Sequence, residues 1–136
     1  MNLLSKEDIT ENIIVIKINR SYRENMSAEE LYDVTRGFWK RKIESVESAE
    51  YALAVAHQIV KEVYKIHSWV KAEEEPIHRK TIPYCEETDK GRIIFEGEVA
   101  DEKIREKYIG KSVAAFFQKG EASPTKVIIC KEHGLS

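Results

Sequence analysis

The sequence predicts an α+β domain in which five short strands form a mixed, largely antiparallel sheet or a small barrel, accompanied by two main helices. Five short blocks are rich in β-branched and aromatic residues, which favour strands. Two capped amphipathic segments lie between these blocks and are typical of helices. Two of the strand blocks are separated only by His57 and Gln58, a link too short for a parallel crossover. Together these observations favour strand pairing between chain neighbours over a doubly wound parallel fold.

The first predicted strand covers residues 12–19, a β-branched run that is apolar on both faces near its middle. The first predicted helix begins at Ser27, because this serine and Glu30 have the spacing of a capping box. Apolar residues then recur at helical intervals, so we expect the helix to run to about Arg41. Its expected apolar side consists of Leu31, Thr35, Phe38 and Trp39.

Residues 51–56 and 59–70 are predicted to form a hairpin of two strands. In the second strand, alternation is expected to place Val60, Tyr64, Ile66 and Val70 on one face. The same alternation assigns Lys61, Lys65, His67 and Trp69 to the other face. One long helix over residues 49–70 is the alternative, since Ala, Leu, Lys and Glu favour helices. The density of Val, Ile, Tyr and Trp favours the strands.

The second half of the chain is predicted to contain a loop, a strand, a helix and a final strand. Residues 71–90 lack apolar periodicity and contain two prolines, which predicts a long loop. Alternation over residues 91–99 predicts the fourth strand. Asp101 is expected to cap a helix that bends near Gly110 and continues over residues 112–118. Residues 125–130 are the last predicted strand, and residues 131–136 form a polar tail.

Length, charge and cysteine content limit the classes of function. The 136 residues suffice for one domain, predicted over 1–136, with a core that needs no metal or disulfide. The 22 Lys and Arg and 24 Asp and Glu give a net charge of -2, so any nucleic-acid site has to be a local patch. Cys85 and Cys130 are widely spaced, and no run reaches the roughly 18 apolar residues of a membrane span. We predict a cytoplasmic protein without a membrane partner.

Motifs for catalysis, metals and cofactors are not found. The four histidines lack the paired spacing of metal ligands, and no acid/base pair has a convincing spacing. Gly110-Lys111-Ser112 matches the tail of a P-loop, but Arg105 stands where that motif needs a glycine. Tyr108-Ile109-Gly110 matches one half of the GIY-YIG nuclease signature, and the other half is missing. We therefore expect no catalytic residue, no metal and no cofactor.

Cations and aromatic residues gather in three segments of the chain. Arg36, Lys40 and Arg41 lie at the end of the first predicted helix, Tyr22 lies in the loop before it, and Lys65 precedes Trp69. An aromatic plane among positive groups is typical of sites that bind bases and phosphates. A solvated strand face with one half-buried tryptophan is the alternative interpretation.

The segment Thr35-Arg36-Gly37-Phe38-Trp39, with residues 49–55, 59–69, 92–97 and 108–113, resembles a domain of prokaryotic proteins. Some of these proteins carry it beside a GIY-YIG nuclease domain. The layout is also similar to the PUA-like group, which includes EVE, ASCH and YTH domains. This resemblance implies a small mixed barrel that binds RNA or DNA, often with a modified base in an aromatic pocket. It implies Trp39 and Trp69 as pocket walls and Arg36 and Lys40 as phosphate contacts.

The leading hypothesis is a non-catalytic module that binds DNA, RNA or a nucleotide, as a modified-base reader in a defence or nucleic-acid-processing system. Its expected ligand-binding residues are Tyr22, Arg36, Trp39, Lys40, Arg41, Lys65 and Trp69. The alternative is a protein-interaction subunit of a nuclease, toxin or defence system, acting as a homodimer or beside a partner nuclease. An enzyme acting on a small nucleotide is a third hypothesis.

Overall fold

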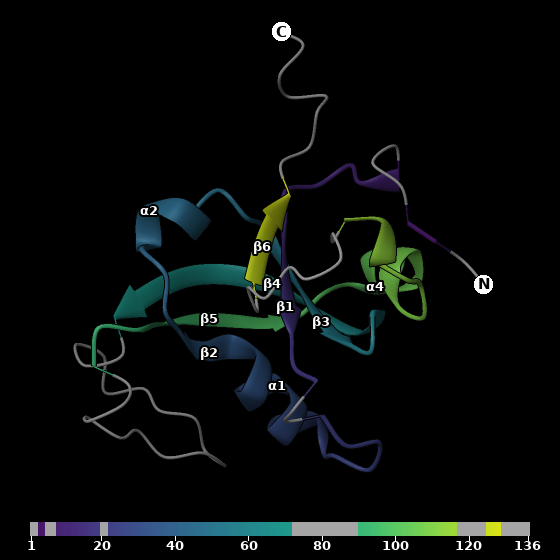
Figure 1. The fold of residues 1–136 in the computed structure, drawn as a ribbon, viewed down its shortest axis with the longest axis horizontal. Coiled ribbons are helices and arrows are strands. Elements are labelled where there is room, and N and C mark those ends of the chain that lie inside the picture. Colours follow the sequence, from purple (N-terminus) through teal and green to yellow (C-terminus); the bar gives the residue numbers. More distant parts are fainter. Residues whose placement is uncertain (1–2, 5–7, 20–21, 72–89, 117–124, 129–136) are drawn as a thin grey trace, which may run out of the picture.

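The computed structural model describes residues 3–4, 8–19, 22–71, 90–116 and 125–128 of the chain (Figure 1). Its strands are β1 (Ile13–Lys17), β2 (Gly37–Trp39), β3 (Tyr51–Ala56), β4 (Ile59–Lys71), β5 (Ile93–Val99) and β6 (Thr125–Ile128). Its helices are α1 (Ala28–Arg36), α2 (Ile43–Val46), α4 (Glu102–Tyr108) and the 3₁₀ helix η2 (Ala114–Phe116). The predicted α+β class is therefore confirmed.

The strands form one mixed sheet in the order β2-β5-β4-β3-β1-β6. Only β1 and β3 pair in parallel, and the other four pairings are antiparallel. All five predicted strands are present, and the short strand β2 is added to them. The sheet is not closed into a barrel, because β2 and β6 lie at its opposite ends.

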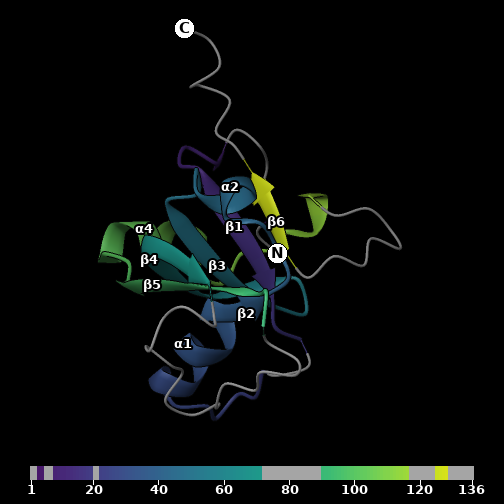
Figure 2. The same cartoon turned by 90° about the vertical axis from the view of Figure 1, so that its left-hand side faces the viewer.

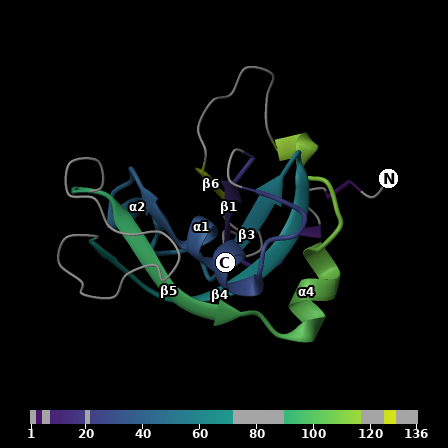
Figure 3. The same ribbon diagram turned by 90° about the horizontal axis from the view of Figure 1, so that it is seen from below.

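Strand β4 curls the sheet. Its pairing with β3 shifts between Ala54 and Val55, and its pairing with β5 shifts between Ile66 and Ser68. Such bulges insert an unpaired residue and increase the local bend of a strand. As a result, β5, β4 and β3 curve around α1, and α4 lies outside the curve (Figure 3). The sheet therefore has a concave face toward α1 and a convex face toward α4.

Each face carries its own core. The convex core combines aliphatic residues of the sheet with α4 and η2, and includes Ile13, Val15, Leu53, Val63, Tyr108 and Phe116. The concave core contains more aromatic residues and includes Ile14, Ile16, Ala52, Tyr64, Ile93 and Phe95. Side chains of α1 and α2 pack against this second core, and Figure 2 shows these helices below and above the strands.

The first helix ends earlier than the sequence predicts. Ser27 and Glu30 form the expected capping box, but α1 stops at Arg36 rather than near Arg41. Gly37 then lies so close to β5 that a Cβ atom would sit 2.9 Å from the carbonyl oxygen of Ile93. The missing side chain lets the backbone pair with β5, so residues predicted as helix form β2 instead.

The hairpin of β3 and β4 is confirmed, and the alternative helix over residues 49–70 is not found. His57 and Gln58 both have positive φ angles, 53° and 71°, which matches the twist that tight hairpins require. Asp101 caps α4 as expected. The predicted continuation of this helix over 112–118 is wrong for residues 112–116. Ser112 makes isolated β-bridges to Leu3 and Ile59, and the short 3₁₀ helix η2 follows. Residues 117 and 118 are not described.

Several expectations fall on residues that the structure does not describe. They are the interior of the predicted loop 71–90, both cysteines, the end of the last predicted strand and the tail 131–136. In the part of the chain that is described, no helix has the length and apolar character needed to span a bilayer.

Candidate functional site

Trp39 and Trp69 lie on the concave face, on the two strands that flank β5. Trp39 is opposite Ile93 and Trp69 is opposite Phe95, and all four belong to the concave core. Neighbouring strands are about 4.8 Å apart and two residues span about 6.7 Å along a strand, so the two tryptophan backbones are about 12 Å apart across β5. Both indole side chains are half-buried. Phe95 therefore forms an aromatic floor between two tryptophans that remain partly accessible.

The bulge in β4 brings Trp69 to this face. Tyr64 and Ile66 point into the concave core, and strict alternation from them would turn Trp69 outward. The register shift between Ile66 and Ser68 reverses the alternation, so Trp69 packs on Phe95 with ring centroids 5.3 Å apart. The prediction that Trp69 shares a face with Lys65 and His67 is therefore wrong.

The two indole N–H groups differ in their partners. Trp39 donates a 2.8 Å hydrogen bond from Nε1 to the carbonyl oxygen of Thr35. Trp69 Nε1 is shielded from solvent and has no hydrogen-bond partner among the described residues. A buried donor without a partner costs about 1–3 kcal/mol, so such groups call for a specific explanation.

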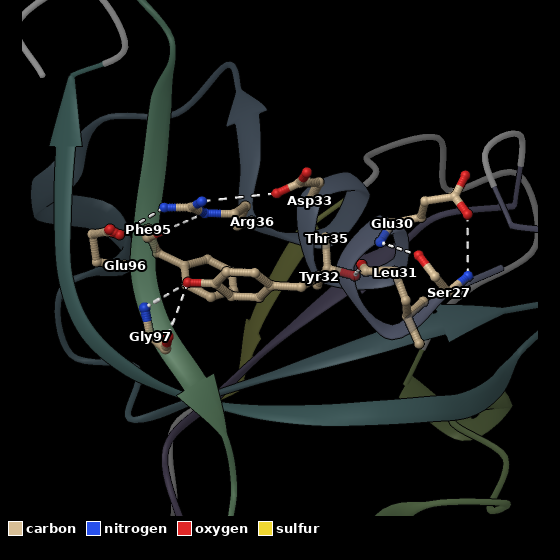
Figure 4. Close-up of polar contacts among 10 residues, drawn as sticks. All are labelled: Ser27, Glu30, Leu31, Tyr32, Asp33, Thr35, Arg36, Phe95, Glu96 and Gly97. Carbon is tan, nitrogen blue, oxygen red and sulfur yellow. Dashed lines mark hydrogen bonds and ion pairs between the residues drawn. The ribbon is translucent and has the colours of Figure 1, made fainter. Parts of the chain in front are cut away.

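Arg36 connects α1 to β5 and is itself buried, with only 4% of its surface exposed. Its Nε donates to the carbonyl oxygen of Phe95 at 3.1 Å, and its Nη2 donates to Glu96 Oε1 at 2.7 Å (Figure 4). Its Nη1 lies 3.8 Å from Asp33, and its guanidinium carbon lies 4.6 Å from the centre of the Tyr32 ring. Arg36 is thus engaged by two carboxylates, and a phosphate would have to compete with both.

Tyr32 completes the contact between α1 and β5. Its hydroxyl donates to the carbonyl oxygen of Gly97 at 2.9 Å and accepts from the Gly97 N–H at 3.0 Å. Burial raises the pKa of Tyr32, which keeps the hydroxyl protonated for the donated bond. Because β2 pairs only with Ile93 and Ile94, Tyr32 and Arg36 occupy polar backbone groups on the rest of this β5 edge.

Lys40 and Arg41 follow Trp39 directly. Lys40 is exposed and has no polar partner among the described residues. Arg41 donates from Nη1 to Thr125 Oγ1 at 2.9 Å and from Nε to Ser45 Oγ at 3.3 Å. Arg41 follows β2, one edge strand of the sheet, and Thr125 begins β6, the other edge strand. The hydrogen bond between them therefore connects the two edges. Lys40 is therefore the more available cation beside Trp39.

Lys65 and Tyr22 lie elsewhere. Lys65 alternates with Tyr64 and Ile66, so it is on the convex side of β4, where it is exposed. Tyr22 packs at the other end of the concave core, with Lys61 Nζ 5.1 Å from the centre of its ring. Lys61 and Trp69 are eight positions apart on β4, or roughly 25 Å along the strand. The structure thus places Trp39 and Trp69 in one core, with Lys40 and Arg41 next to Trp39 in the chain and Arg36 bound to β5.

Two residues of this arrangement were not predicted from the sequence. They are Phe95, which lies between the tryptophans, and Tyr32, whose hydroxyl holds α1 against β5 at Gly97. The alternation of Ile93 and Phe95 was a usable signal for Phe95, since it places both on one strand face. Tyr32 carried no such signal, because its role depends on which strand edge α1 covers.

A metal site and a cavity were also sought among the described residues. These residues contain no group of three or more His, Cys, Asp and Glu side chains that could hold a metal ion. A cavity of about 120 Å³ lies at the end of β1 and the β3–β4 hairpin, lined by Lys17, Asn19, Val55, Gln58 and Val113.

Comparison of the chain with protein-family models, with curated proteins and with solved structures gives no match. Membership of the PUA-like group therefore stays a prediction.

Proposed function

We propose that this chain is a non-catalytic module that binds nucleic acid or a nucleotide by holding a base between Trp39 and Trp69. The observation that carries the proposal is the placement of both tryptophans, half-buried, on one concave face on either side of Phe95. Aromatic side chains stack on the faces of bases, each stack contributing about 1–3 kcal/mol. A base entering from the concave side would meet the accessible parts of two indole rings, which lie over the fully buried ring of Phe95.

Phosphates are assigned to the cations next to Trp39. Lys40 is exposed and Arg41 lies beside it, so a backbone attached to a stacked base has cations within reach. Arg36 becomes a positioning residue, because its bonds to Phe95 and Glu96 fix the aromatic floor. Lys65 and Tyr22 are left out of the proposed contact. The net charge of -2 is consistent with a local patch rather than a broad basic surface.

A PUA-like reader of modified bases remains the finer form of this proposal. What supports it is a curled mixed sheet whose concave side carries a helix and two tryptophans. The resemblance of the sequence implies a small mixed barrel with a base enclosed by aromatic walls, whereas the sheet of this chain is open.

The test is a titration with short single- and double-stranded DNA and RNA, with and without modified bases, followed by tryptophan fluorescence at low and physiological salt. We expect quenching that survives physiological salt, and an affinity reduced about tenfold by Trp69→Ala. Lys40→Ala should weaken binding and lower the salt dependence by about one counterion, and its matched control Lys65→Ala should do neither. The absence of a response from every oligonucleotide at either salt would refute the proposal.

An interaction subunit is the second candidate, and the open edges of the sheet favour it. β6 pairs on one side with β1 and on the other side with no described strand, and such an edge can pair with another chain. A homodimer in sedimentation, or a partner nuclease that co-purifies, combined with no affinity for nucleotides would favour this function over the first.

A further inference from the structure

The cavity of about 120 Å³ lies at the convex core, where β1 ends beside the turn between β3 and β4. We propose that it binds a short-chain carboxylate such as propionate, with Lys17 holding the carboxylate and Val55 and Val113 contacting the alkyl group. This site is separate from the proposed base-binding face, because Trp39 and Trp69 belong to the concave core.

The floor of the cavity is apolar and has a lysine beside it. Val55 and Val113 belong to the convex core, and each has 1% of its surface exposed. Lys17 is the direct partner of Val55 in the parallel pairing of β1 with β3, so the two side chains project from the same face of the sheet. Lys17 is half-buried. A ligand here would therefore meet two valines and a partly desolvated cation.

Hydrogen bonds fix the polar rim of the cavity. Asn19 Oδ1 accepts from the backbone N–H of His57 at 2.8 Å, which ties the end of β1 to the hairpin turn. The backbone N–H of Val113 donates to the carbonyl oxygen of Gln58 at 2.8 Å, which ties the same turn to the segment before η2. The cavity is therefore formed before a ligand arrives, as is usual for small-molecule sites.

The rim offers more donors than acceptors. Because the side-chain oxygen of Asn19 accepts from His57, its amino group is the part left for a ligand. The carboxamide of Gln58 is exposed and makes no hydrogen bond with the described residues. Lys17 adds a positive charge, and none of the described residues that line the cavity is acidic. A ligand with one negative charge and two acceptor oxygens, a carboxylate, matches this set of groups.

The turn that carries Gln58 is strained. His57 and Gln58 have φ angles of 53° and 71°, in the left-handed region that favours glycine. A glycine at residue 58 would relieve this strain and would remove the carboxamide from the rim. Backbone strain of this kind gathers at sites of binding and catalysis. The turn therefore supports a ligand-binding role for Gln58.

The volume limits the ligand to a small molecule. A cavity of about 150 Å³ takes benzene, which has six carbon atoms, so about 120 Å³ accommodates about five non-hydrogen atoms. Pockets for drug-sized ligands are larger, at about 300–1,000 Å³. Inorganic phosphate also has five such atoms, but it offers no apolar group to the valines and carries more than one negative charge against one lysine. Propionate fits both the charge and the floor.

The experiment is a titration of the isotope-labelled chain with sodium propionate at constant ionic strength, followed by the NMR amide signals of His57, Gln58 and Val113. Propionamide, which has the same shape and no charge, and inorganic phosphate are titrated in parallel. We expect saturable shifts with propionate and a dissociation constant of about 1 mM. Propionamide and phosphate should bind about tenfold more weakly.

Two variants and one control assign the contacts. Lys17→Met removes the charge and keeps a long side chain, so it should weaken propionate binding about tenfold and leave propionamide unchanged. Lys65→Met is the matched control, because Lys65 is exposed on the convex side and does not line the cavity, and we expect no effect. Gln58→Gly should raise the midpoint of thermal unfolding, since glycine adopts a positive φ readily, and weaken propionate binding about fivefold.

Three outcomes would overturn the proposal. They are the absence of saturable shifts in the folded chain, binding of propionamide or phosphate as tight as that of propionate, and an unchanged propionate affinity in Lys17→Met or Gln58→Gly. None of them bears on the base-binding proposal, because no oligonucleotide is present and the tryptophans are unchanged.

Discussion

The two faces of the sheet use the same strands for different kinds of core. On the convex face, aliphatic side chains pack under α4, and the hydroxyl of Tyr108 donates to Glu11 Oε1 at 2.5 Å. On the concave face, Tyr32, Tyr64, Phe95 and Trp69 form a continuous series of ring contacts, with centroids 5.2 to 6.3 Å apart. The concave series ends at a buried donor without a partner.

The buried polar groups of the two faces, Glu11 and the indole N–H of Trp69, also differ. Burial acts to raise the pKa of Glu11, but hydrogen bonds from Tyr108, Thr10 and Lys107 outweigh it and lower the pKa overall. The carboxylate of Glu11, at the edge of the convex core, thus has hydrogen-bond donors from its own chain on both oxygens. The two faces therefore differ in how their buried polar groups find partners, and five changes test that difference.

The largest loss of stability is expected from Arg36→Ala. Removing this buried guanidinium leaves Asp33 and Glu96 without their cation and the Phe95 carbonyl without its donor. Breaking a buried pair in this way costs about 3–5 kcal/mol. Urea unfolding measures the loss, and a change below about 1 kcal/mol would show that the arginine does not hold β5.

Leu53→Ala tests the convex core alone. Leu53 is fully buried there, and the cavity left by its truncation should cost about 3 kcal/mol of unfolding free energy. Because Leu53 faces away from the tryptophans, the affinity of the folded fraction for an oligonucleotide should not change. A parallel loss of affinity, measured well below the unfolding midpoint, would mean that the faces are not independent.

Gly97→Ala tests the close pairing of β5 with β4 at the residue that also bonds Tyr32. A Cβ atom at residue 97 would overlap the carbonyl oxygen of Lys65, so β5 would have to shift away from β4 at a cost of about 2 kcal/mol. Gly91→Ala is the control. Its φ of 87° disfavours a side chain but nothing lies within 4 Å, and about 1 kcal/mol is expected. Thermal unfolding should rank the two variants in this order.

Tyr64→Phe tests the concave core through pH. Burial raises the pKa of Tyr64 above its ordinary value of 10, so the unfolded chain loses this proton at a lower pH than the folded chain. Stability should therefore hold below about pH 10 and fall as the pH rises further. The fall should be shallower in Tyr64→Phe, as urea unfolding across the alkaline range would record. The same dependence of unfolding free energy on pH in both proteins would contradict a raised pKa of Tyr64 in the folded chain.

The smallest difference is expected between Trp39→Phe and Trp69→Phe. Both changes remove an indole, but only Trp39→Phe removes a hydrogen bond, the one to Thr35. Trp39→Phe should therefore be the less stable variant by about 1 kcal/mol. The reverse order in chemical unfolding would show that the N–H of Trp69 has a partner in the free chain.

Much of the fold was predictable because its signals are local. The capping box at Ser27, the cap at Asp101 and the two-residue hairpin at His57 act through residues close in sequence. Strand β2 was not predictable from such signals, since it depends on Gly37 meeting the backbone of Ile93. Helical periodicity continued past Arg36 even though the helix does not.

The candidate site was predictable in its aromatic residues and not in its charges. Composition and resemblance predict Trp39 and Trp69, and both side chains lie in the concave core. Strict alternation predicts Lys65 beside Trp69, but one inserted residue near His67 reverses that relation. Because β4 contains two register shifts, its two faces cannot be assigned by counting alternate residues from one end.

The bond from Arg41 to Thr125 also has a consequence for biosynthesis. The two residues are 84 positions apart, and strand β1 receives its second neighbour, β6, only after residues 125–128 have been translated. A ribosome that has released residues up to Lys71 has delivered β1, β3 and β4, but neither the partner of β2 nor that of Arg41. The arrangement around Trp39 is thus completed only after β5 and β6 have been translated, and a chain that terminates before β6 exposes β1 as an unprotected edge.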